Sequence, residues 1–173
     1  MRKETSTPSV DRLCPRCGLC CNGVLFADVR LQKEDDFRRL SKLRLPLRRK
    51  GNRRGFPQPC ACFDGKLCRI YADRPAYCRA FECGLLKRVQ TGSMDVDAAL
   101  ARIAGAKALA EEVRRLLRRL GDRDEDLALI QRYARVMREP IDLSGPDDVI
   151  ARRAKLMSAV DDLIQVLQRE FLK

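Results

Sequence analysis

The sequence CPRCGLCC, residues 14–21, places four cysteines within eight residues. The whole chain has nine cysteines and no histidine, and every cysteine lies between residues 14 and 83. Such thiols can form disulfides, bind metal or act as reactive groups. The choice among these three constrains the fold of the N-terminal half more than any other feature of the sequence.

Disulfides are the least favoured of the three. The first ten residues, MRKETSTPSV, contain no apolar run and do not resemble a secretory signal. No stretch approaches the roughly 18 apolar residues of a membrane span. We therefore predict a cytoplasmic, bacterial protein with no membrane contact. In a reducing cytosol a dense cysteine pattern more often binds metal or is catalytic, and an odd number of cysteines leaves one unpaired in any all-disulfide scheme.

The spacing of the first four cysteines is typical of metal ligands. Two residues between cysteines allow a tight turn to bring both sulfurs to one ion, and Gly18 suits the unusual backbone angles of such a turn. Neighbouring side chains in an extended segment point to opposite sides, so Cys20 and Cys21 are predicted to serve different sites. Cys14, Cys17 and one of this pair then share one site, and the other member reaches toward the second cluster.

The second cluster, CACFDGKLCRIYADRPAYCRAFEC, spans residues 60–83 and contains the other five cysteines. Eight thiols fill two four-thiolate sites and leave one spare. The absence of histidine excludes mixed Cys/His zinc sites and Cys/His catalytic dyads. Four thiolates suit structural zinc or an iron–sulfur cluster, and they leave no open position for a substrate. Metal binding without hydrolytic activity is therefore the favoured interpretation.

Two motifs, CPRCGLCC followed by CRIYADRPAYCRAFEC, resemble the CxxCxxCC family, a zinc- or iron-chelating domain often called YkgJ-type cysteine-cluster proteins. The resemblance covers about residues 14–86. The ligands that it implies are Cys14, Cys17, Cys20, Cys21, Cys60, Cys68, Cys78 and Cys83. The family usually has a bulky apolar residue where Cys62 stands, so Cys62 is predicted to be the spare thiol, although the choice between Cys60 and Cys62 stays open.

Three other residues of the second motif are predicted to surround the metal site. Tyr71 can bury its ring against the site while its hydroxyl stays hydrogen-bonded. Arg74 and Arg79 place cations beside an anionic thiolate cluster, which lowers thiol pKa values and offsets the negative charge. The alternative is that Arg74 pairs with Asp73 or Glu82 at the surface.

From residue 93 onward the sequence has helical periodicity. The first helix is predicted from Ser93 as N-cap to Gly121 as stop signal, and a second over about 124–138. A third begins near Pro146 and continues to the end of the chain. Its apolar seam repeats at sevens and consists of Ile150, Met157, Ile164 and Phe171 with Val160 and Leu167. A three-helix bundle buries this seam, and a helix-mediated homodimer or protein partner is the alternative.

We therefore predict a mainly α protein: a flexible tail over 1–12, a small irregular cysteine-rich metal-binding domain over 13–92, and a C-terminal three-helix bundle over 93–173. The favoured function is metal chelation through thiolates, structural or electron-transferring. Iron in an iron–sulfur cluster is favoured as cofactor, with zinc as the alternative.

Two other functions are weaker interpretations. The resemblance extends to flagellin lysine methylase, which uses S-adenosylmethionine, but this chain has no Gly-rich loop after a strand to hold that cofactor, so an enzyme is not favoured. A metal-stabilised nucleic-acid-binding module is suggested by charge. Residues 1–83 contain 19 Lys/Arg against 9 Asp/Glu, and much of the excess lies in residues 38–54. Phe37 and Phe56 are the only aromatic residues near that basic run, so stacking on bases is poorly supported.

Overall fold

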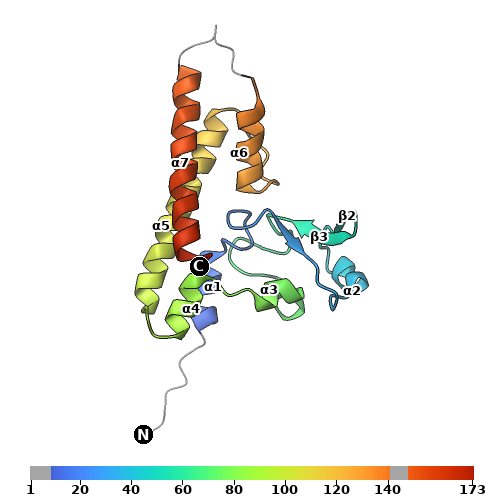
Figure 1. The fold of residues 1–173 in the computed structure, drawn as a ribbon. Helices are drawn as coiled ribbons and strands as arrows, with labels where there is room; N and C mark the ends of the chain where they lie inside the picture. The colour runs from blue at the N-terminus through green and yellow to red at the C-terminus, as the bar shows by residue number, and fades with distance from the viewer. Residues whose placement is uncertain (1–8, 141–147) are drawn as a thin grey trace.

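The computed structural model describes residues 9–140 and 148–173 and is mainly α-helical, as predicted (Figure 1). The helices are α1 (Ser9–Cys17), α2 (Phe37–Lys42), α3 (Ala76–Ala80), α4 (Gly84–Gln90), α5 (Val96–Arg119), α6 (Leu129–Arg138) and α7 (Asp148–Glu170), with a 3-10 turn, η1 (Tyr71–Asp73). Three short strands are β1 (Asp28–Arg30), β2 (Arg48–Lys50) and β3 (Arg53–Pro57). Residues 9–12 of the predicted tail belong to α1, and residues 1–8 lie outside the described part.

The long helices α5 and α7 pack against each other and form the extended column of the molecule (Figure 1). The predicted stop at Gly121 is confirmed, since this residue has a φ of 89° and its N–H donates to the Arg118 carbonyl. The predicted N-cap is wrong by two residues. Asp95, not Ser93, caps α5 by accepting a 2.7 Å hydrogen bond from the Ala98 N–H. Ser93 instead donates its hydroxyl hydrogen bond to the Arg88 carbonyl, at the end of α4.

Helix α6 begins five residues later than the sequence predicts. The acidic segment from residue 124 stays outside the helix, because its carboxylates bind arginines on α6. Arg132 Nε lies 2.6 Å from Asp122 Oδ2, and Arg135 pairs with both Asp122 and Asp124. The segment therefore folds back on α6 instead of beginning it.

The predicted seam of α7 is only partly correct. Ile150 and Met157 are 48% and 45% exposed, whereas Val160, Leu167 and Phe171 are buried. The buried side of α7 also includes Leu156 and Leu163, which continue the period of three and four residues of a single helix face. The predicted first position of this helix, Pro146, lies outside the described residues.

The cysteine-rich half is built around a small antiparallel sheet with strand order β1-β3-β2. Its core cluster consists of Val29, Leu40, Leu45, Phe56 and Cys62. Helix α2 contributes Leu40 to this cluster, which fixes the helix to one face of the sheet. In Figure 1 the sheet and α2 lie at the side of the molecule away from α5 and α7.

The two halves share a larger apolar core. Leu13, Leu19 and Leu85 of the cysteine-rich half belong to one buried cluster with residues of α5 and α7. Helix α1 packs against α5, and α4 packs against both α5 and α7. This packing ties the first cysteine motif to the rigid helical column; the division into domains at residue 92 stays a prediction. Within the described ranges, no helix is both long and apolar enough to cross a lipid bilayer.

Candidate metal centre

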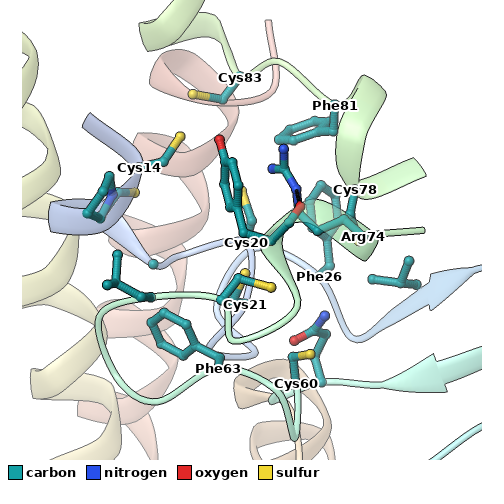
Figure 2. A pocket seen from close by; sticks show the side chains of 18 of the residues that line it. Cys14, Cys20, Cys21, Phe26, Cys60, Phe63, Arg74, Cys78, Phe81 and Cys83 are labelled. Carbon is teal, nitrogen blue, oxygen red and sulfur yellow. Dashed lines mark hydrogen bonds between the residues drawn. The ribbon is translucent and has the colours of Figure 1, made fainter. Parts of the chain in front are cut away.

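Eight of the nine thiols line one cavity of about 300 Å³ between the cysteine-rich half and the helices (Figure 2). They are Cys14, Cys17, Cys20, Cys21, Cys60, Cys68, Cys78 and Cys83. Cys62 does not line it. That side chain is 4% exposed within the sheet core, and its Sγ lies 3.4 Å from the Leu43 carbonyl. The cavity thus gathers the same eight residues that the family resemblance implies.

The first motif reaches the cavity through a turn at Gly18. Helix α1 ends at Cys17, and Gly18, with a φ of 70°, reverses the chain. The Gly18 carbonyl accepts hydrogen bonds of 2.9 and 3.0 Å from the N–H groups of Cys21 and Asn22. A Cβ atom at this glycine would lie 2.6 Å from Cζ of Phe63, a side chain of the cavity wall. The motif therefore needs glycine both for its backbone angle and for its close packing.

Cys20 lies in the electrostatic environment of one group of thiols. Burial raises its pKa well above the ordinary value, and nearby Cys17, Cys21, Cys83 and Cys14 raise it further. Burial likewise raises the pKa of Cys17 to about 12, with smaller contributions from Cys83 and Cys14. Cys83 joins this group from the start of α4, where its Sγ accepts from the Leu86 N–H at 3.5 Å. These four thiols form the first group: Cys14, Cys17, Cys20 and Cys83.

Cys21 lies among different thiols. Burial raises its pKa to about 12, and the next contributions come from Cys60, Cys68 and Cys78. Burial also raises the pKa of Cys60 to about 11, with further increases from Cys62 and Cys68. Burial raises the pKa of Cys78 to about 12, and Cys60 and Cys68 add to the increase. In Figure 2, Cys14 and Cys83 lie on one side of the Cys20–Cys21 pair and Cys60 on the other. The second group is Cys21, Cys60, Cys68 and Cys78.

The sulfurs of each group do not converge on one point. Across residues 9–140 and 148–173, no set of three or more Cys, Asp or Glu side chains stands at the spacing that would already hold a metal ion. Burial raises the pKa of several of these thiols, so they are neutral in the metal-free protein at neutral pH. Metal binding would deprotonate them and supply the attraction that closes each group.

Aromatic side chains form one wall of the cavity. The rings of Phe26 and Phe81 meet edge to face at 4.9 Å between centroids, and Phe26 meets Tyr77 in the same way at 6.1 Å. Phe63 covers the Gly18 turn from another side (Figure 2). These rings partly shield the thiols from water, and burial is the main cause of the raised pKa values of Cys17, Cys20 and Cys21.

The three predicted neighbours of the thiols differ in position. Arg74 lines the cavity and lowers the pKa of Cys78, which partly offsets the effect of burial. Tyr71 also lines it but is 45% exposed, so the predicted burial of its ring is wrong; the Arg74 guanidinium covers the ring at 3.6 Å instead. Arg79 is exposed, does not line the cavity, and donates to the Arg74 carbonyl. The alternative partner Asp73 is paired with Arg39.

Gln58 also lines the cavity and is absent from the predicted site residues. Its side chain is 2% exposed, and its Oε1 has no hydrogen-bond partner among the described residues. Leaving a buried polar atom unpaired costs about 1–3 kcal/mol. A polar or charged occupant of the cavity would remove this cost, since a carboxamide can present either its oxygen or its NH₂ group. No sequence signal marks Gln58 beyond its place two residues before Cys60.

The donor set fits a thiophilic metal. Thiolate ligands select zinc, copper(I) or iron–sulfur clusters over hard oxygen-seeking ions. Each group offers four thiols, the number that closes a tetrahedral zinc site or ligates one cluster.

The comparison with protein families agrees with the resemblance of the two motifs. Residues 13–96 match the model of CxxCxxCC, whose description is "Putative zinc- or iron-chelating domain". The matched segment is just under half of the chain and contains all nine cysteines. No curated protein and no solved structure matches the chain.

Proposed function

Because residues 13–96 form a CxxCxxCC domain, we propose that this chain binds metal at two four-thiolate sites. Cys14, Cys17, Cys20 and Cys83 hold the first. Cys21, Cys60, Cys68 and Cys78 hold the second. The bound centres have a structural or electron-transferring role.

The division of the adjacent Cys20–Cys21 pair carries this proposal. Apart from burial and its neighbour Cys21, the pKa of Cys20 is raised by Cys17, Cys83 and Cys14. The pKa of Cys21 is raised mainly by Cys60, Cys68 and Cys78, with a smaller contribution from Cys14, and these differences support two groups around the same cavity. Two centres use all eight lining thiols and leave out Cys62, which packs in the sheet core.

We favour iron–sulfur clusters over bare zinc ions as the occupants. A cavity of about 300 Å³ has room for the inorganic sulfide that a cluster carries in addition to iron. When bound, a cluster supplies one-electron transfer, whereas zinc supplies only a cross-link. The chain's own contributions are Arg74, whose cation offsets thiolate charge, and the aromatic wall, which partly shields the thiols from water.

Four thiolates per centre leave no coordination position for a substrate, which supports a binding protein rather than an enzyme. No described feature supports the alternative of an S-adenosylmethionine-dependent lysine methylase, so the proposal does not include that activity.

Anaerobic purification of the full chain, followed by metal analysis, sulfide analysis and a visible spectrum, tests the proposal. We expect a brown protein with iron and acid-labile sulfide in comparable amounts. A colourless protein with about two zinc ions per chain would support the two thiolate sites but would show that their cofactor is zinc instead of an iron–sulfur cluster. Metal at trace levels only, under anaerobic handling, would refute both versions.

A further inference from the structure

A basic patch covers the β2–β3 hairpin and α2, at the side of the molecule away from α5 and α7 (Figure 1). Its exposed members are Arg38, Lys42, Arg44, Arg48, Arg49, Arg53 and Arg54. The guanidinium of Arg54 lies 4.9 Å from the ring centroid of Phe37. This contact packs the hairpin against the first turn of α2. The shared core of sheet and helix holds these residues in one rigid unit.

The cations of this basic patch have no carboxylate partners among the described residues. Among the described arginines of residues 38–54, only Arg39 has a carboxylate partner, which is Asp73. Several arginines of the helical half do have carboxylate partners: Arg88 of α4 pairs with Glu170, and Arg118 of α5 pairs with Glu111. The charge of the basic patch is therefore left for an external anion, whereas the charge of the bundle is largely balanced internally.

The β2–β3 hairpin also places two positively charged side chains directly opposite each other. Arg49 stands directly across from Arg54 in the ladder, an arrangement that destabilises a sheet. Side chains alternate between the two faces of a strand, so Arg48 and Arg53 project from the face opposite to that pair. The tip of the hairpin is thus cationic on both faces, and folding alone gives no reason for this placement.

We propose that the basic patch is a binding surface for double-stranded DNA, with the β2–β3 hairpin lying in the major groove. The major groove admits a two-stranded β-ribbon. The phosphates line this groove, and guanidinium groups on the ribbon and beside it bind phosphate with two parallel hydrogen bonds. The phosphates supply the counter-charge that the described residues do not.

A duplex explains the basic patch better than a lipid surface does. Membrane-binding surfaces combine cations with exposed apolar side chains that insert between lipids. The exposed large apolar residues of the described chain are Leu67, Tyr71, Tyr77, Ile130, Ile150, Met157 and Leu172, and none lies within residues 37–57. The surface offers charge without an inserting group.

The test measures binding of the full chain, as purified anaerobically, to a fluorescein-labelled DNA duplex of about 20 base pairs over a salt series. The variant is Arg49→Gln with Arg53→Gln, which removes one cation from each face of the hairpin. The matched control is Arg102→Gln with Arg119→Gln, two exposed arginines of α5 with the same change in net charge. Thermal unfolding and metal content are measured for all three proteins. The metal content is expected to agree, and the hairpin variant is expected to be at least as stable as the others, because it removes the opposition of Arg49 and Arg54.

We expect the hairpin variant to lose about tenfold or more in affinity at fixed salt, and the control to stay within about twofold. The slope of log affinity against log salt should shrink by about 0.9 for each phosphate that the variant no longer neutralises. Equal losses of affinity in both variants would show a general charge effect and overturn the proposal. So would an absence of binding at low salt, or retention by anionic lipid vesicles but not by DNA.

Arg44 offers a second variant that separates folding from binding. Its φ of 62° is a left-handed angle just after α2, where glycine is favoured. Arg44→Gly is therefore expected to keep or raise the Tm while weakening DNA binding. An unchanged affinity in this variant and in the hairpin variant would contradict the proposal. Because metal content is measured in parallel, these outcomes do not depend on whether the thiolate sites are correct.

Discussion

Replacement of Cys17 by serine is expected to remove at least the metal of the first site and to lower strongly the stability of the cysteine-rich half of the chain. Cys17 is the last residue of α1, lies among Cys14, Cys20 and Cys83, and packs against the core shared with α5. Metal-binding free energy in structural thiolate sites amounts to about 10–16 kcal/mol and acts as folding free energy. Loss of one ligand therefore removes a large share of stability, which metal analysis and thermal unfolding will measure.

Cys62→Ala is the matched control for this substitution. Cys62 is also buried, but it packs among Val29, Leu40 and Phe56 instead of lining the cavity. Its replacement should leave the metal content unchanged and cost about 1–2 kcal/mol, the effect of a small cavity in the sheet core. Unchanged metal in Cys17→Ser, or lost metal in Cys62→Ala, would contradict the assignment of ligands.

The free energy of unfolding is expected to depend on pH in opposite directions in the metal-free and the metal-loaded protein. In the metal-free protein, burial raises the pKa of Cys17 and Cys21 from 9.0 to about 12 and that of Cys60 to about 11. The unfolded chain loses these protons near pH 9 and the folded chain keeps them, so the free energy of unfolding falls as pH rises from about 9 to about 12. Each unit of pKa difference is worth about 1.4 kcal/mol per thiol.

The metal-loaded protein should instead lose stability as pH falls. Its ligands are thiolates, and acid protonates them and releases the metal, so the free energy of unfolding falls as pH falls. Thermal unfolding of both forms under reducing, anaerobic conditions over the same pH series tests the reversal. Parallel pH profiles would show that metal binding does not use the buried thiols.

Features that depend on local chemistry were predictable from the sequence. The left-handed turn at Gly18 and the helix stop at Gly121 follow from the backbone freedom of glycine. The helical periodicity after residue 93 predicts α5 and α7, because each must bury one apolar face.

Features that depend on tertiary partners were not predictable. The helix start near residue 124 failed because Asp122 and Asp124 bind arginines that lie on α6. Ile150 fits the heptad seam but is exposed, since α5 covers a neighbouring stripe of α7. Gln58 belongs to no recognisable sequence motif, and only the folded structure shows that it is a buried polar residue of the cavity wall. The excess of Lys and Arg in the basic patch can be counted from the sequence, whereas its lack of carboxylate partners among the described residues is seen only in the folded structure.

X-ray absorption spectroscopy of the metal in the anaerobically purified protein tests the central claim most directly. We predict that sulfur supplies all the ligands, about four per metal ion, with a metal–sulfur distance of about 2.3 Å if the ion is zinc. For iron, the same sulfur ligation should be accompanied by short iron–iron scattering from a cluster. Nitrogen or oxygen atoms among the ligands would contradict binding by the eight cavity thiols.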